Sequence, residues 1–183
     1  MPLRPLSDVS PADWFVDSAA DWWDKVCLGP PGYDAYVRVH FDMEGEVSDV
    51  SVVSGILDIL ARYTATADTT YVGVWKGWGF WPHDHHPDAT PASNFHVPNR
   101  DYQLLGGPLA DVVDWQSLGL EGDWGGAVPH LIWPYDHEWF LAADVDPDWF
   151  GVGGSQKLID EILADPRLDA ESTEYDASDW ETR

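Results

Sequence analysis

The apolar residues of this chain change their spacing from one segment to the next, and this spacing constrains the fold. From Tyr33 to Phe41 apolar and polar residues alternate, as a half-buried strand requires. From Ser51 to Tyr63 the apolar residues instead form a stripe at helical spacing. Both kinds of element recur along the chain, so helices and strands must share one core.

The remaining segments extend this pattern. We expect a helix from Ser10 to about Cys27, strands at 70–76 and 100–105, a short helical piece at 109–115, a hairpin at 130–145 and a helix after Ser155. This order predicts an α+β fold with a mostly antiparallel sheet and helices packed on one face. With 183 residues, 44% of them hydrophobic, we expect one domain over residues 1–165. Residues 166–183 are expected to form an acidic, frayed tail.

The charge is strongly one-sided. The chain has 33 Asp and Glu against 9 Lys and Arg, a formal net charge of −24, and the acids are densest in the last third. Such a chain is not expected to grip nucleic-acid phosphates. Three explanations of the acidity stay open: a GC-rich coding bias, adaptation to high salt, and a surface shaped for a basic partner.

The chain has a single cysteine, Cys27. It can form no intrachain disulfide, and it is better explained as a packing residue than as a nucleophile. The first residues lack a basic start followed by an apolar stretch, and no segment approaches 18 uninterrupted apolar residues. We therefore expect a cytoplasmic protein without a membrane span.

One stretch carries a resemblance. It begins at Trp133-Pro134, continues through Asp136, Trp139, Asp144 and Asp146, and ends in Val152-Gly153-Gly154-Ser155. This pattern resembles the C-terminal signature of an uncharacterised actinobacterial protein family, and with Arg100-Asp101-Tyr102 and Gly107-Pro108-Leu109 the resemblance covers residues 75–165. It implies a bacterial, cytoplasmic origin and assigns no catalytic residue.

A histidine-rich segment is the first candidate site. Imidazole and carboxylate groups are ordinary transition-metal ligands, and the candidate ligands are His83, His85, His86, His96 and Asp88. The pattern lacks His-Glu-x-x-His, so the alternative is a polar surface loop that binds metal only adventitiously. No other cofactor is expected.

Aromatic residues in the same segment are the second candidate site. The chain has 12 tryptophans, and Trp78, Phe80 and Trp81 lie where no regular structure is predicted. Exposed aromatic side chains mark binding sites. The alternative is that this segment folds over the sheet and buries them.

Carboxylates and glycines near the end of the chain are weaker candidates. Glu138 and Asp144 could share one face of a strand as an acid and base, but acidic residues after a strand are more typical of a turn in which they accept backbone N–H groups. Gly151 to Ser155 could cradle an anion, although a tight strand-to-helix turn capped by Ser155 explains it better.

These observations favour a non-catalytic acidic protein that binds a basic protein partner, in an immunity-like or antitoxin-like role. One alternative is a metal-dependent enzyme that uses the segment from His83 to His96. A second is a mimic of nucleic acid that competes for a basic groove. The sequence leaves the oligomeric state open.

Overall fold

A computed structural model describes residues 3–41, 49–77, 93–113 and 129–175. The helices are η1 Ser10–Ala12, α1 Asp13–Val16, α2 Trp22–Leu28, α3 Asp49–Leu60, η2 Ala61–Tyr63, α5 Leu109–Val113 and α6 Gln156–Ala164. The strands are β1 Arg4–Pro5, β2 Ala35–His40, β3 Thr70–Trp75, β4 Asn94–Val97, β5 Arg100–Gly107, β6 Leu131–Pro134, β7 Trp139–Ala142, β8 Trp149–Gly154 and β9 Asp169–Thr173. In the part of the chain described here, no helix has the length and apolar character needed to cross a membrane.

Within the described residues, all nine strands belong to one sheet in which every pairing is antiparallel. The strand order is β1-β5-β3-β6-β7-β8-β2-β9, and β4 pairs with β5 beside this path. The α+β class and the antiparallel sheet predicted from the sequence are confirmed.

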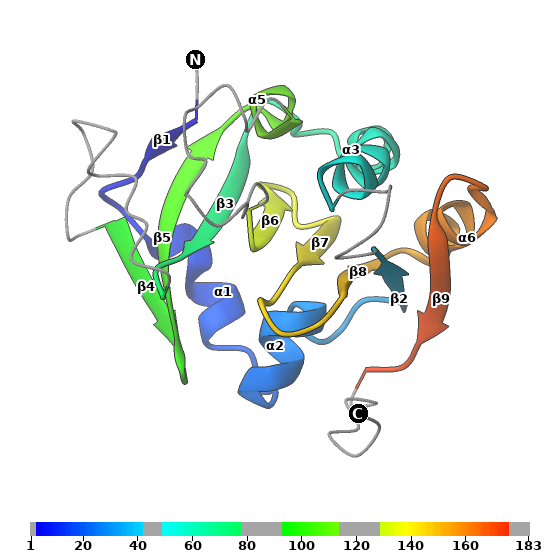
Figure 1. Ribbon diagram of the computed structural model, residues 1–183. Helices are drawn as coiled ribbons and strands as arrows, with labels where there is room; N and C mark the ends of the chain where they lie inside the picture. The colour runs from blue at the N-terminus through cyan, green and yellow to red at the C-terminus, as the bar shows by residue number, and fades with distance from the viewer. Residues whose placement is uncertain (1–2, 42–48, 78–92, 114–128, 176–183) are drawn as a thin grey trace.

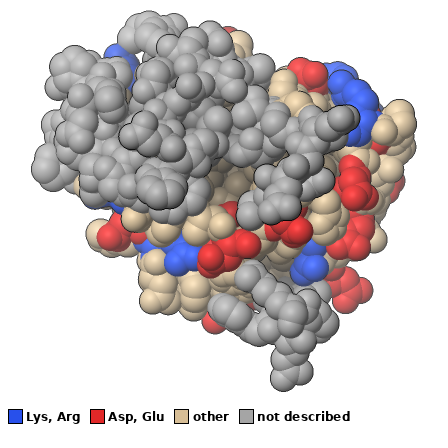
Figure 2. Space-filling model, viewed as in Figure 1, with Lys and Arg blue, Asp and Glu red and all other residues tan. Residues whose placement is uncertain are grey.

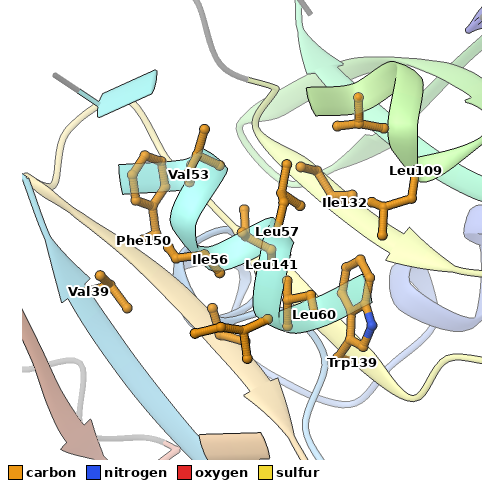
Figure 3. Close-up of a cluster of buried hydrophobic side chains, with 14 of the residues drawn as sticks. Val39, Val53, Ile56, Leu57, Leu60, Leu109, Ile132, Trp139, Leu141 and Phe150 are labelled. Atoms are coloured by element: carbon orange, nitrogen blue, oxygen red, sulfur yellow. The ribbon is translucent and has the colours of Figure 1, made fainter. Parts of the chain in front are cut away.

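Helices cover both faces of this sheet, so the prediction that they pack on one face is wrong (Figure 1). On one face α3 and α6 bury a core that includes Ile56, Leu57, Leu60, Ile132, Trp139 and Leu141 (Figure 3). On the other face α1 and α2 bury Phe15 and Val26 against a second set of strand residues. The cause lies in the central hairpin, because every residue of β6 and β7 is buried and each face of these strands needs its own cover.

The helix expected from Ser10 to Cys27 is interrupted. The chain forms η1 and α1, turns, and starts again at α2. The Lys25 ammonium donates a hydrogen bond of 2.7 Å to the carbonyl of Val16 at the end of α1, and the Asp21 carboxylate accepts one of 2.9 Å from the Trp23 amide at the start of α2. The break therefore has its own caps.

Two glycines allow α2 to lie close to the sheet. Gly29 ends α2 with a φ of +84°, and a Cβ there would come within 2.5 Å of the Phe140 ring. A Cβ on Gly151 of β8 would come within 2.0 Å of the Cys27 carbonyl oxygen. Cys27 itself is 1% exposed within this core, as expected for a packing residue.

The C-terminal segment is not simply a frayed tail. Residues Asp169–Thr173 form β9, which pairs with β2 from His40↔Asp169 to Tyr36↔Thr173. The expectation of a frayed tail from residue 166 is therefore wrong for this stretch. Its side chains are mostly exposed, so backbone pairing holds the strand and the apolar pattern gives little sign of it.

Candidate functional site

One end of the sheet gathers polar and aromatic side chains from several strands. Here β2, β3 and β7 end, and β5, β6 and β8 begin, as the pairings His40↔Trp149, Trp75↔Tyr102 and Leu131↔Ala142 show. The cluster at this end is named the Arg100 centre and consists of Arg100, Asp144, Asp146, Trp22 and Trp75.

Arg100 and Asp144 form a two-pronged ion pair at the heart of this centre. The Nε and one terminal nitrogen of Arg100 each donate a hydrogen bond of 2.8 Å to a different carboxylate oxygen of Asp144. The two side chains are only 12% and 2% exposed. The hydrogen bond with Asp144 is the main cause that raises the pKa of Arg100, so the guanidinium stays charged.

Four further groups surround this guanidinium. Asp146 accepts a hydrogen bond of 3.2 Å, and the carbonyl of Asn99 accepts one of 3.1 Å. The rings of Trp22 and Trp75 lie 5.4 and 5.3 Å from the guanidinium carbon. Arg100 is thus held by acceptors and aromatic rings of its own chain, an arrangement suited to fixing the strands in place.

His130 lies beside the centre and serves as a hydrogen-bond acceptor. Its Nδ1 accepts a bond of 3.1 Å from the backbone N–H of Trp75, which places the ring proton on Nε2. Burial is the main reason that the pKa of His130 is lowered to about 4; the Asp144 charge acts to raise this pKa, and the smaller effect of the Arg100 charge acts to lower it. His130 is therefore neutral at pH 7 and joins β3 to β6.

The opposite end of the β6–β7 hairpin holds a second ordered carboxylate. Asp136 accepts hydrogen bonds of 2.8–2.9 Å from the Thr64 hydroxyl and 2.8 Å from the Ala65 amide, and its own amide donates to the Thr66 hydroxyl. Burial alone would raise the pKa of Asp136, but the hydrogen bonds outweigh it and lower the pKa below its usual value. This carboxylate ties the hairpin turn to the segment before β3.

The residues of the sequence signature have structural roles. Trp133 and Trp139 are fully buried, Asp136 holds the hairpin turn, and Ser155 caps α6 by accepting a hydrogen bond of 3.3 Å from the Leu158 amide. Gly151 to Gly154 belong to strand β8, so the turn predicted there is wrong, whereas the predicted cap at Ser155 is confirmed.

The acid–base pair considered for Glu138 and Asp144 is not formed. Glu138 is exposed just before β7 begins, whereas Asp144 is buried beyond its other end. Arg100 was not recognised as the partner of Asp144. The one available signal was an arginine at the start of a predicted strand in a chain with few cations.

The predicted metal and aromatic sites fall mainly outside the described residues. His83, His85, His86, Asp88, Trp78, Phe80 and Trp81 all lie there. His96 is described: it is exposed on β4, and its Nδ1 lies 3.0 Å from a carboxylate oxygen of Asp101. Among described residues, no group of three or more His, Cys, Asp or Glu is placed to hold a metal ion. Both sites stay predictions.

Three arginines of the described chain form ion pairs with its own carboxylates. Arg62 pairs with Glu161, Arg167 pairs with Asp165 and Asp58, and Arg100 pairs as above. Exposed carboxylates without an ion-pair partner from the described residues include Asp13, Asp34, Asp68, Asp148, Asp160, Asp169 and Glu174. Figure 2 shows acidic side chains gathered on its right-hand side, over α6 and β9.

Comparisons with protein-family models, with curated proteins and with solved structures find no match to this chain.

Proposed function

We propose that this chain is a non-catalytic binding protein that recognises a basic protein partner through its acidic surface, in an immunity-like or antitoxin-like role. The observation that carries the proposal is the asymmetry between the two kinds of charge. Arg62, Arg100 and Arg167 pair with carboxylates of the described chain, whereas exposed carboxylates such as Asp13, Asp34 and Glu174 have no ion-pair partner among the described residues.

This asymmetry has a consequence for binding. Exposed charges of one sign add up to a long-range potential, which accelerates the encounter with a partner of opposite sign. The effect extends over a Debye length of roughly 8 Å at physiological ionic strength. A protein that must find and neutralise a basic target quickly gains most from this arrangement.

The side chains that could act as acid, base or nucleophile are occupied with structural contacts, which also supports a non-catalytic role. Asp144 is engaged by Arg100, Asp136 by hydroxyl and amide donors, and His130 by a backbone N–H. Cys27 is buried. Each of these described groups is engaged by, or packed within, the fold itself.

The test is an affinity capture from the source organism, followed by binding to the purified candidate. We expect a partner of basic isoelectric point whose purified form binds with an association rate that falls as salt is raised. Recovery of nothing, or of acidic proteins only, would overturn the proposal.

Elemental analysis of untagged protein accompanies this experiment, because a stoichiometric transition metal would favour the metal-dependent enzyme instead.

A further inference from the structure

An open groove of about 730 Å³ lies where α6 meets the beginning of β2 and the end of β9. One wall comes from residues 33–36, a second from one side of α6, and a third from residues 172–175. The groove is far from the Arg100 centre in the strand register, because Ala35 and Thr173 lie at the opposite ends of β2 and β9 from His40 and Asp169.

The charge of this groove has one sign. Asp34 and Glu174 contribute exposed carboxylates, and neither has an ion-pair partner among the described residues. No Lys or Arg is found among the described side chains that line the groove. A cation entering it would meet two uncompensated negative charges.

Its aromatic wall is fixed in position. The hydroxyl groups of Tyr33, Tyr36 and Tyr175 donate hydrogen bonds of 2.8–2.9 Å to the carbonyls of His137, Pro30 and Gly29, respectively. The ring centroids of Tyr36 and Tyr175 are 5.0 Å apart, and those of Tyr33 and Tyr36 are 6.0 Å apart. With their hydroxyls already engaged, these residues offer the groove aromatic surface that attracts cations.

The helix side of the groove is apolar. Ile159 is buried at its base, and Leu163 is 38% exposed, one of two large hydrophobic side chains exposed to this degree in the described chain. A long aliphatic stem could cover this surface while its charged end reaches a carboxylate. Lysine and arginine side chains have this combination of apolar stem and cationic end.

We propose that this groove receives a lysine or arginine side chain from the basic partner. The inference rests on the proposed function and names the part of the surface that gives it specificity. Aromatic rings, two carboxylates and an apolar strip together select a long cationic side chain over a neutral or acidic one. A second copy of the chain fits poorly, because two molecules of charge −24 repel each other.

The first test uses a short peptide whose only charged side chains are one arginine and one lysine, with an Asp- and Glu-containing peptide of equal length as its counterpart. Binding to the full chain is followed by two-dimensional amide NMR and by calorimetry. We expect the cationic peptide to shift signals of residues 33–36 and 172–175, and the acidic peptide to leave them unchanged. Shifts spread over all exposed carboxylates, or equal binding of both peptides, would overturn the inference.

Matched variants separate the groove from general charge. The double variant Asp34→Asn with Glu174→Gln is compared with Asp13→Asn with Asp68→Asn, which removes the same charge from exposed sites outside the groove lining. We expect the groove pair to weaken peptide binding about tenfold and the control pair less than about twofold. Leu163→Gln, which changes no charge, should also weaken binding. Equal losses from both pairs would contradict the inference.

The same variants, tested on the purified protein partner, distinguish the two proposals. If a basic partner binds and only the control carboxylates matter, the groove assignment is wrong and the proposed function stands. If no basic partner is found, the proposed function fails. The groove assignment is then decided by the peptide experiment alone, in which the cationic peptide must bind at residues 33–36 and 172–175. Signals at the groove that shift on removal of residues 176–183, without peptide binding, would identify the chain itself as the occupant and overturn the inference.

Discussion

Asp136 and Asp144 lie at opposite ends of the same hairpin and are stabilised by different chemistry. Asp136 is partly exposed and is satisfied by hydroxyl and amide donors without a counter-charge. The Asp144 side chain is 2% exposed and is matched by the guanidinium of Arg100. Hydrogen-bond donors without charge therefore suffice for a carboxylate that water still reaches, whereas a buried carboxylate needs an opposite charge.

The largest effect is expected from breaking the buried pair. Arg100→Met leaves the Asp144 carboxylate without its counter-charge, so we expect the free energy of unfolding to fall by about 3–5 kcal/mol. Urea denaturation at pH 7 measures it. Adding Asp144→Leu to the same chain should recover much of the loss, because no buried charge then remains.

Arg167→Ala serves as the surface control for this variant. Arg167 pairs with Asp165 and Asp58 while more than half exposed, so its removal should barely move the denaturation midpoint. If Arg100→Met were as mild as this control, the pair would not be holding the strands together.

The next effect concerns pH and His130. Its pKa is about 4 in the folded protein, against 6.5 as the ordinary value, so between these values the unfolded chain binds a proton that the folded chain does not. The free energy of unfolding should therefore decrease as pH falls from 6.5 to 4, by about 2–3 kcal/mol from this residue. The variant His130→Asn should lack this loss of stability between pH 6.5 and pH 4 when it is compared with the parent chain. An NMR titration that placed the His130 pKa near 6.5 would refute the assignment.

A smaller loss is expected at the other end of the hairpin. Asp136→Ala removes the acceptor of the Thr64 and Ala65 donors, and we expect a destabilisation of about 1–3 kcal/mol at pH 7. Because the folded-state pKa of Asp136 is lowered, this stabilisation is present above pH 3.8 and is lost as pH falls through the folded-state value. A double-mutant cycle that combines Asp136→Ala with Thr64→Val measures the interaction free energy between the two side chains. A value of zero would show that their hydrogen bond does not contribute to stability.

The smallest effect should come from the aromatic neighbours of Arg100. Trp22→Leu keeps an apolar side chain but removes one ring near the guanidinium, so we expect a loss of about 0.5–1 kcal/mol. The same substitution combined with Arg100→Met should add little to the loss from Arg100→Met. Full additivity would show that Trp22 acts only through its own packing.

The sequence predicted the elements whose apolar pattern is strong. The strand at 33–41, the helix at 51–63 and the hairpin around residues 134–137 are confirmed as β2, α3 and β6–β7. It did not predict β9, because a strand held by backbone pairing with mostly exposed side chains carries little apolar pattern. The break between α1 and α2 was also missed, since it depends on Lys25 reaching Val16 across the turn.

The candidate sites were less accessible to sequence reasoning. The sequence offered Asp144 only as a candidate acid or base, because its partner lies 44 residues away in sequence and is brought near only by the order of strands in the sheet. The groove has the same character, because its walls come from three segments that the fold brings together. Residue types indicate chemistry, and the topology decides which groups meet.

The most direct test of the central claim is the association rate constant with the purified basic partner, measured as ionic strength is raised. If the exposed carboxylates guide binding, the rate should fall steeply, by tenfold or more between about 0.02 and 0.5 M salt, while the dissociation rate changes less. An association rate that is independent of salt would contradict the account.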